Sequence, residues 1–579
     1  MDKSTLETRC EKREISMNAS LVIFYLIGAF AVIVGSVLTY VTSRRLGWKI
    51  PLWLLYALMG LSAYIFFAQY LKYQNLHFFT DFSHWLQILR NITIKGWPEI
   101  LSHEFIIPGT LNYFSVHFIP LIYLFAIPFK LIPRPETLMV FNALAMLSAA
   151  IPLYKLALLH YVPPLKIRGG EEGLWKDGRK MSGFFVVVLL LWYPTFQYIT
   201  LYEFEMLRFS IPLLLWMLYF FETRRMVPYL IFVILAILVR EEVGLTVAMF
   251  GVYAWVFAKR RKEGLSALTL GLVGFVLITS VVMPAFSSAE QFKHVAAGSF
   301  AQFGTSPLEI VSSVIRHPIA ALTVILDPTK LANIFMLGLP VLFVPLLAPL
   351  VLIGAAANIG IGLLSEGTIH TSYMLYYIAP SVPFIFYALL KAWPRFVSLS
   401  LWERVGLPAQ AGVRGEGAFM NALLAAVLVS NIFFGPSPIS LQFWLKNIQP
   451  APFRTQDFHW SVYRVTDHHR AANKFVEMIP EDAIVSAQEF LQPRLFKKRG
   501  AMPFPQIVSK DGQYQADYVF VDRTNNGLRS ESPAHMSKEE IDAVVANEVW
   551  ERVAEEDGYE LYRNVYESTN GVANTTNLD

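Results

Sequence analysis

Long apolar segments that contain almost no charge occupy most of this chain. A helix needs about 20 apolar residues to cross the hydrocarbon core of a membrane. The clearest candidates are residues 21–41, 50–71, 139–159, 182–199 and 265–284. Hydrophobic residues make up 55% of the 579 residues and charged residues only 16%, which excludes an ordinary soluble domain. The pattern predicts an α-helical polytopic membrane protein with about 12 or 13 transmembrane helices.

The composition of the chain changes near residue 440. Residues 1–440 are predicted to form the transmembrane domain, with an external loop at 72–134, and residues 441–579 to form a soluble α/β domain. The elements expected in the soluble domain are helices at 467–478 and 538–549, strands at 483–487 and 516–522, and a hairpin turn at Asp557-Gly558. The single cysteine, Cys10, excludes an intrachain disulfide and a thiolate metal cluster.

Lysine and arginine concentrate in alternate loops, and basic loops of membrane proteins usually face the cytoplasm. The basic loops are 44–49, 155–180, 222–225, 259–262 and 391–414. The loops left for the outside are 72–134, 202–208, 240–242, 287–330 and 365–376, together with the C-terminal domain. The scheme also places the N-terminus outside, although its basic residues favour the inside. It requires residues 115–132 to be embedded without crossing and residues 331–364 to turn as a hairpin.

An acidic residue, Asp81, directly follows a predicted membrane helix. Residues 82–93 have the amphipathic pattern of a helix that lies in the membrane interface, and Thr80 or Asp81 is expected to cap it. His117 occurs in the same external loop. A charge near hydrocarbon is costly unless it is paired or hydrated, so Asp81 is a candidate catalytic residue. The alternative is an aspartate that only caps the helix.

Two further charged groups fall in short breaks on the same side. Glu203 and Glu205 separate two apolar segments, and an extended backbone is expected to turn both carboxylates the same way. The alternative is a pair of solvated loop acids. Arg240-Glu241-Glu242 lies between two apolar halves, as in binding sites built on discontinuous membrane helices. The alternative here is an Arg–Glu pair that locks two helices together.

Tyr376 and Tyr377, at the end of the last external loop, add hydroxyl groups and aromatic faces. Aromatic residues at a membrane interface are also typical of an aromatic belt. A divalent metal is a candidate cofactor, with Asp81, Glu203 and Glu205 as candidate ligands. No nucleic-acid partner is expected, because the sequence has no basic-aromatic binding motif.

Five short motifs occur in an order that resembles the DUF2079 family of predicted membrane proteins. They are Thr80-Asp81-Phe82-Ser83-His84-Trp85, Ser115-Val116-His117-Phe118-Ile119-Pro120, Tyr202-Glu203-Phe204-Glu205, Val239-Arg240-Glu241-Glu242-Val243 and Tyr376-Tyr377-Ile378-Ala379-Pro380. Residues 479–487 followed by 516–522 are similar to the tail of that family. The resemblance covers most of residues 75–525.

That family in turn resembles the multi-span glycosyltransferases of the GT-C type. Those enzymes take a sugar from a polyisoprenyl-phosphate donor and use a carboxylate in the first external loop. The resemblance implies that Asp81 is the catalytic acidic residue, that His117 lines the same cavity and that Arg240 faces the donor phosphate.

The function that this resemblance implies is that of a GT-C-like glycosyltransferase of the cell membrane. It would move a sugar from a polyisoprenyl-phosphate donor to an acceptor on the extracytoplasmic side. The candidate substrate-binding residues are His117, Glu203, Glu205, Arg240, Glu241, Glu242, Tyr376 and Tyr377. The rivals are a secondary transporter that uses the same carboxylates and a non-catalytic membrane scaffold. The sequence shows no internal repeat and its acids gather on one side, which favours the enzyme over the transporter.

Overall fold

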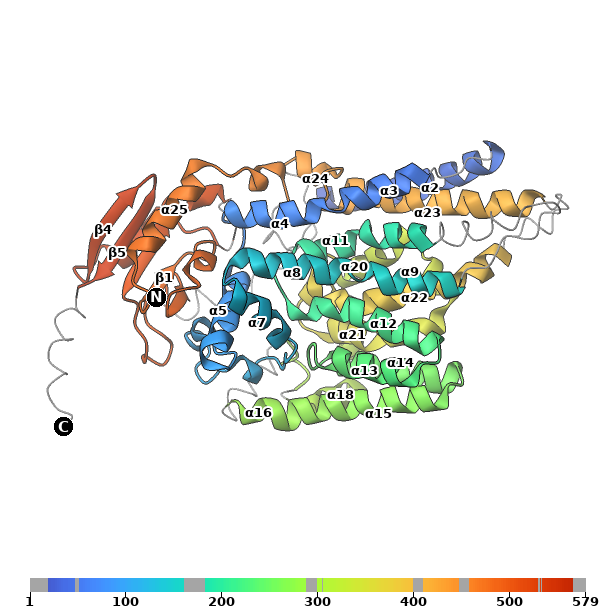
Figure 1. The fold of residues 1–579 in the computed structure, drawn as a ribbon, viewed down its shortest axis with the longest axis horizontal. Coiled ribbons are helices and arrows are strands. Elements are labelled where there is room, and N and C mark those ends of the chain that lie inside the picture. The colour runs from blue at the N-terminus through green and yellow to red at the C-terminus, as the bar shows by residue number, and fades with distance from the viewer. Residues whose placement is uncertain are drawn as a thin grey trace.

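The computed structural model describes residues 19–565 apart from 47–51, 161–182, 288–298, 305, 399–409, 447–457, 529–531 and 533. Cys10, the N-terminus and parts of the predicted loops at 44–49, 155–180, 287–330 and 391–414 lie outside the described residues. A bundle of helices forms one end of the molecule and a small sheet domain forms the other (Figure 1).

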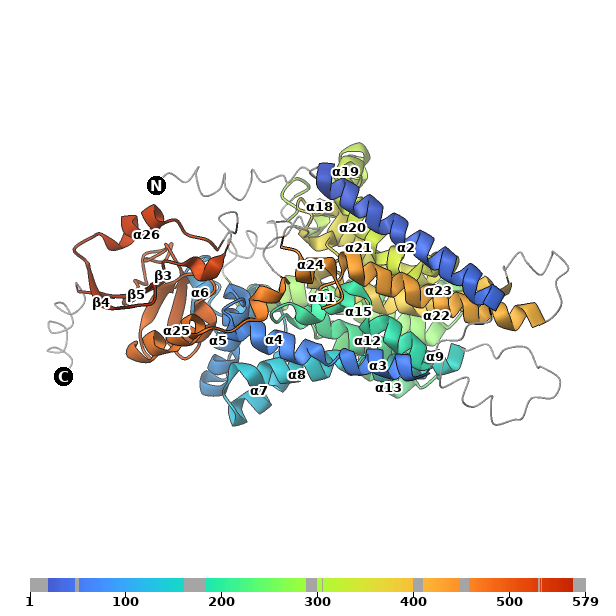
Figure 2. The ribbon, with the colours of Figure 1, turned by 90° about the horizontal axis from the view of Figure 1, so that it is seen from above.

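The helices of the bundle run mostly along the long axis of the molecule (Figure 1). They are α2 (Ala19–Leu46), α3 (Leu52–Leu61), α4 (Tyr64–Gln74), α8 (Pro135–Leu147), α9 (Ala150–His160), α11 (Pro194–Leu201), α12 (Ser210–Glu222), α13 (Met226–Ile237), α14 (Val243–Val252), α15 (Arg261–Leu277), α16 (Met283–Ala285), α18 (Pro307–Arg316), α19 (Pro318–Ile325), α20 (Pro328–Gly338), α21 (Ile353–Leu364), α22 (Val382–Ser398), α23 (Gln410–Phe434) and α24 (Leu441–Trp444). The first and the last long helices, α2 and α23, lie side by side in both views (Figures 1 and 2).

Within the described residues, four helices are long and apolar enough to cross a membrane, and the number rises to six if each of two bent pairs is one span. The predicted 12 or 13 full-length spans are therefore not seen as continuous helices, because several apolar runs are broken into shorter helices. The run at 50–71 breaks between α3 and α4, and the run at 331–364 turns between α20 and α21. At that turn Leu342 and Phe343 adopt left-handed φ angles of 53° and 55°. Residues 115–132 supply only a short apolar helix, as the topology requires.

Helices α14 and α15 approach each other closely at paired glycines. A Cβ atom on Gly271 would lie 2.4 Å from the carbonyl oxygen of Gly244. Larger side chains at either position would force the backbones apart, so these glycines fix where α14 begins relative to the bundle.

A separate set of short helices follows α4. It comprises α5 (Thr80–Lys95), α6 (Leu101–Glu104), η1 (Tyr113–Ser115) and α7 (Ile122–Leu131). The predicted helix at 82–93 is confirmed within α5, but the predicted side-chain cap is wrong. The N-cap residue is Phe79, and its side chain makes no capping hydrogen bond. Asp81 lies inside the first turn of α5, which leaves its carboxylate available to another partner.

Helix α5 is buried on its polar side as well as its apolar side. The hydroxyl of Ser83 donates to the carbonyl oxygen of Gln492 over 3.2 Å, and the hydroxyl of Ser102 donates to Gln87 over 3.3 Å. Helix α5 therefore lies between the bundle and the C-terminal domain, as Figure 2 shows. Its polar side is covered by protein rather than left open.

The C-terminal domain contains a five-stranded sheet with the strand order β2-β1-β3-β5-β4. The strands are β1 (Ile484–Ala487), β2 (Gly500–Pro503), β3 (Tyr518–Asp522), β4 (Trp550–Glu556) and β5 (Tyr559–Asn564). Strands β2, β1 and β3 are parallel, and β5 and β4 are antiparallel to their neighbours. In the register of β3 and β5, Phe520 lies opposite Leu561.

Two helices accompany the sheet, and one of them matches its predicted bounds. Helix α25 (Asp467–Met478) is confirmed, whereas α26 (Lys538–Val545) ends earlier than predicted. The predicted hairpin turn is confirmed, because Asp557 and Gly558 join β4 to β5 with φ angles of 52° and 85°. The apolar clusters beside the sheet also contain Leu76 and Phe105, so the segment around α5 and α6 completes the core of this domain.

Candidate functional site

The carboxylate of Asp81 is held by a tyrosine from another part of the chain. The hydroxyl of Tyr202 donates to Oδ2 of Asp81 over 2.5 Å. Tyr202 is the C-cap residue of α11, and Asp81 occupies the first turn of α5. The surrounding protein raises the pKa of the Asp81 carboxyl by desolvation, and the hydrogen bond from Tyr202 lowers it by a smaller amount. Asp81 thus has the character of a carboxylate poised to accept a proton.

Glu203 lies beside Asp81 and is fixed by the backbone of α5. Its Oε2 atom accepts a hydrogen bond from the amide N–H of Phe82 over 2.9 Å. Burial, and then the negative charge of Asp81, raise the pKa of Glu203 to about 8. The neighbouring carboxyls of Asp81 and Glu203 therefore both ionise less readily than they would in water.

Arg240 forms a second part of the site together with three carboxylates. It lies in the break between α13 and α14, as the sequence predicts. Its Nη1 atom is 3.5 Å from Oε1 of Glu205 and its Nε atom is 3.1 Å from Oε1 of Glu242. The nearest oxygen of Glu241 is 3.9 Å from Nε. The charged triplet therefore forms an internal ion-pair group that also joins two helices.

His117 connects this group to the segment between α6 and α7. Its Nδ1 atom is 2.7 Å from Oε1 of Glu241, and its Nε2 atom is 2.8 Å from Nη2 of Arg240. The other carboxylate oxygen of Glu241 accepts the amide N–H of Phe118 over 3.1 Å. The segment between α6 and α7 is thus held against the break between α13 and α14 by both side-chain and backbone contacts.

Two tyrosines link the Asp81 part of the site to the Arg240 part. The ring of Tyr376 packs edge-on against the ring of Tyr202 with centroids 4.9 Å apart. The Tyr376 hydroxyl donates to the Tyr377 hydroxyl over 2.9 Å, and the Arg240 guanidinium lies 5.9 Å from the Tyr377 ring centroid. A continuous chain of contacts therefore runs from Asp81 to Arg240.

The structure brings together every residue that the sequence analysis singled out for the site. Glu203 and Glu205 are both buried, but they face different partners, so they do not present two carboxylates to one ligand.

Among the described residues, no group of three or more His, Cys, Asp or Glu side chains is arranged to hold a metal ion. The candidate set of Asp81, Glu203 and Glu205 does not converge on one point in this conformation.

Several buried polar atoms of this cluster have no hydrogen-bond partner among the described residues. They are Oε1 of Glu205, Nε of Arg240, Oε2 of Glu242 and both Nε and Nη2 of Arg208. Buried polar atoms are nearly always hydrogen-bonded, and exceptions mark sites that take a ligand or water. The site therefore retains donors and acceptors for a bound molecule.

Arg208 is a further buried charge of this cluster that the sequence motifs did not indicate. Its side chain is fully buried, and Nη1 donates to Oδ1 of Asn142 over 3.2 Å and to the carbonyl oxygen of Tyr202 over 3.4 Å. An arginine near the start of an otherwise apolar segment was the available signal, because such a charge must find partners inside the protein.

A different charged group lies at the opposite end of the bundle. Glu222, the last residue of α12, is 2.6 Å from Nζ of Lys391 and 3.5 Å from Nε2 of His160. His160 and Glu222 are the last residues of α9 and α12, and Lys391 lies in the second half of α22; these parts of the helices are remote from α5 (Figure 1). The Glu222 group and the Asp81 site therefore occupy opposite ends of the bundle.

Comparison with known proteins places the chain in a family. The profile of "Predicted membrane protein (DUF2079)" matches residues 80–561. The crystal structure of ArnT from Cupriavidus metallidurans bound to undecaprenyl phosphate has a TM-score of 0.46 and 12% identity, and the match covers 89% of this chain and 99% of that chain. The same protein in the apo state gives a TM-score of 0.43 and 11% identity, and the match covers 88% and 98% of the two chains. The curated proteins contain no match. This multi-pass membrane protein belongs to the DUF2079 family.

Proposed function

We propose that this protein is a membrane glycosyltransferase that uses a polyisoprenyl-phosphate-linked sugar as its donor. The acceptor is a hydroxyl compound that reaches the end of the bundle where α5 lies, which we place on the extracytoplasmic side. The observation that carries the proposal is a chain of contacts between a carboxylate that can accept a proton and a buried guanidinium. Asp81, with its raised pKa, is connected through Tyr202, Tyr376 and Tyr377 to Arg240, whose guanidinium is buried among carboxylates.

The reaction assigns a different task to each end of this chain of contacts. The acceptor oxygen attacks the anomeric carbon of the donor while the bond from that carbon to the phosphate oxygen breaks. The phosphate oxygen leaves with the bonding electrons, and Asp81 takes the proton of the acceptor hydroxyl. Arg240 stabilises the phosphate that leaves, because its planar fork of N–H groups matches phosphate oxygens.

His117 and Tyr202 act through these two residues. His117 contacts both Arg240 and Glu241, so it orients the guanidinium. Tyr202 holds the Asp81 carboxylate in one rotamer and favours its charged form. Buried groups held in this way lose little freedom in the transition state, which is the general benefit of a preorganised site.

The test is the Asp81→Asn variant of the purified full-length protein. The replacement keeps the shape of the side chain and removes its charge, so release of polyisoprenyl phosphate should fall by about 10²–10⁴-fold. Binding of the donor should change little, because Asp81 is assigned to the acceptor proton.

Asp327→Asn is the matched control. Asp327 caps α20 by accepting the amide N–H groups of Thr329 and Lys330 at 2.8 and 3.0 Å. Asparagine is about as good a cap as aspartate, so this variant should keep full turnover. Equal turnover in Asp81→Asn and Asp327→Asn would refute the catalytic assignment of Asp81.

A further inference from the structure

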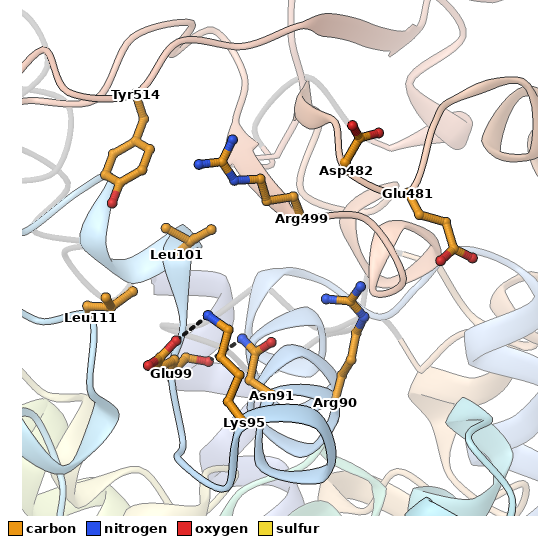
Figure 3. Close-up of a pocket in the computed structure, with 10 residues that line it drawn as sticks. All are labelled: Arg90, Asn91, Lys95, Glu99, Leu101, Leu111, Glu481, Asp482, Arg499 and Tyr514. Carbon is orange, nitrogen blue, oxygen red and sulfur yellow. Dashed lines mark hydrogen bonds and ion pairs between the residues drawn. The ribbon is translucent and has the colours of Figure 1, made fainter. Parts of the chain in front are cut away.

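A pocket with a volume of about 420 Å³ lies between α5 and the C-terminal domain, apart from the Asp81 site. Its lower wall comes from the second half of α5 and the segment before α6, and its upper wall from the sheet domain (Figure 3). Its lining includes Arg90, Glu99, Glu481, Asp482, Arg499 and Tyr514. Because the two walls belong to distant parts of the chain, the pocket exists only where the C-terminal domain packs on α5.

The charges of the pocket are balanced and mostly free. Lys95 pairs with Glu99 over 2.5 Å, which satisfies one cation and one acid. The other charged residues are two arginines, Arg90 and Arg499, and two acids, Glu481 and Asp482. Their side chains make no hydrogen bond or ion pair with any described residue. A pocket with equal numbers of free cations and carboxylates does not select an ion of either sign.

A hydroxyl group can use both kinds of free group, because it donates one hydrogen bond and accepts others. Guanidinium groups supply donors to hydroxyl oxygens, and carboxylates accept hydroxyl hydrogens. A molecule that carries many hydroxyl groups therefore matches this lining better than a phosphate or an ammonium ion.

Tyr514 adds an aromatic surface to the same pocket. Its ring packs edge-on against the buried ring of Phe105, with centroids 5.4 Å apart and an interplanar angle of 64°. This contact fixes the orientation of the tyrosine ring, which is directed into the pocket in Figure 3. A rigid aromatic ring beside hydrogen-bonding groups suits a ring with one apolar face and several hydroxyls.

We infer that this pocket binds a neutral saccharide and serves as a second subsite for the acceptor, an assignment that rests on the proposed glycosyl transfer. Arg90 lies about 14 Å along α5 from Asp81, at the helical rise of about 1.5 Å per residue. A single helix therefore carries the proposed base at one end and the saccharide contacts at the other. The acceptor in this reading is an oligosaccharide that extends beyond the sugar at Asp81.

The test applies the detergent-solubilised full-length protein to an array of neutral and acidic oligosaccharides. Neutral oligosaccharides should be retained, and Kd for a retained glycan should rise about tenfold in Arg499→Ala, because each removed hydrogen bond involves a charged group. Tyr514→Ala should weaken binding as well. Arg470→Ala is the matched control, since Arg470 lies on the surface of the same domain and pairs with the exposed Asp467.

Two results would overturn the inference. One is that the protein retains no neutral oligosaccharide. The other is that it retains acidic glycans alone and that inorganic phosphate displaces them, which would identify an anion site. Failure of the saccharide site and failure of the proposed glycosyl transfer can be distinguished with two variants. Asp81→Asn should bind glycans as the wild type does, whereas Arg499→Ala should still bind the lipid-phosphate donor.

Discussion

The Tyr202 hydroxyl and the Asp81 carboxylate are hydrogen-bonded over 2.5 Å, although 121 positions separate them in the chain. Tyr202 lies at the end of a helix of the bundle, and Asp81 lies in the first turn of the helix that supports the C-terminal domain. The bond therefore couples the bundle to the segment that separates it from the sheet domain.

We expect Tyr202→Phe to shift the pH dependence of glycosyl transfer. The hydrogen bond from Tyr202 lowers the pKa of Asp81, so its removal should raise that pKa. A general base must be ionised, so the acidic limb of the kcat profile should move to higher pH. Tyr229→Phe is the control, because the Tyr229 hydroxyl donates to the backbone oxygen of Glu263 over 3.0 Å, away from Asp81. Superimposable profiles for Tyr202→Phe and the wild type would contradict the role of the bond.

Arg240→Lys should weaken donor use more than it weakens folding. Lysine keeps the positive charge among Glu205, Glu241 and Glu242, but it lacks the fork that matches a phosphate. We expect KM for the lipid-phosphate donor to rise about tenfold or more, with the protein still eluting as a single species in detergent. The control is Arg260→Lys. Arg260 pairs with Glu263 at the far end of α13 and α15, so this variant should leave the KM for the donor unchanged. A normal donor KM in Arg240→Lys would remove Arg240 from the phosphate site.

Cysteine labelling of intact cells tests the proposed sidedness. In a Cys10→Ser background, a cysteine in place of the exposed Lys474 should react with a membrane-impermeant reagent. A cysteine in place of Arg261, the exposed first residue of α15 within the basic segment 259–262, should react only after the cells are opened. The reverse pattern would place the Asp81 site on the cytoplasmic side.

The stability of the C-terminal domain should fall as the pH rises above the ordinary pKa of histidine. Nε2 of His468 lies 3.1 Å from Asp522 and Nδ1 lies 2.9 Å from Asp557, and these carboxylates raise the pKa of the imidazole. Thr524 and the stacked ring of Tyr559 are its other neighbours, and the adjacent His469 has a lowered pKa because of burial. A raised folded-state pKa gives stabilisation that is complete below the unfolded pKa and is lost as the pH rises through the folded one.

The measurement for this prediction is amide hydrogen exchange of the sheet, corrected for intrinsic exchange, below and above pH 6.5. His468→Gln should abolish most of the pH dependence of protection. His535→Gln, in the same domain, should keep it, because the His535 ring has no polar partner among the described residues. Protection that is independent of pH in the wild type would show that the two ion pairs do not stabilise the domain.

Local patterns were sufficient for much of the secondary structure. The helical period of residues 467–478 predicts α25 with its correct ends, and Asp557-Gly558 predicts the turn between β4 and β5. Strands β2, β4 and β5 were not predicted as strands, although the turn between β4 and β5 was. Strand β2 has only four residues, and β4 is an edge strand whose side chains are mostly charged and exposed.

The sequence alone determined that the chain is a helical membrane protein with an α/β C-terminal domain. It also located the charged breaks between the apolar segments. Both are possible because hydrophobicity, periodicity and turn chemistry act over a few neighbouring residues. Only the tertiary structure decided which charges meet. It directed Glu203 to the backbone of α5 and Glu205 to Arg240, and it covered the polar side of α5 with the C-terminal domain. These pairings depend on how short helices pack across more than a hundred residues of sequence. A local pattern therefore shows that a buried charge needs a partner, but the packing of the whole chain selects that partner.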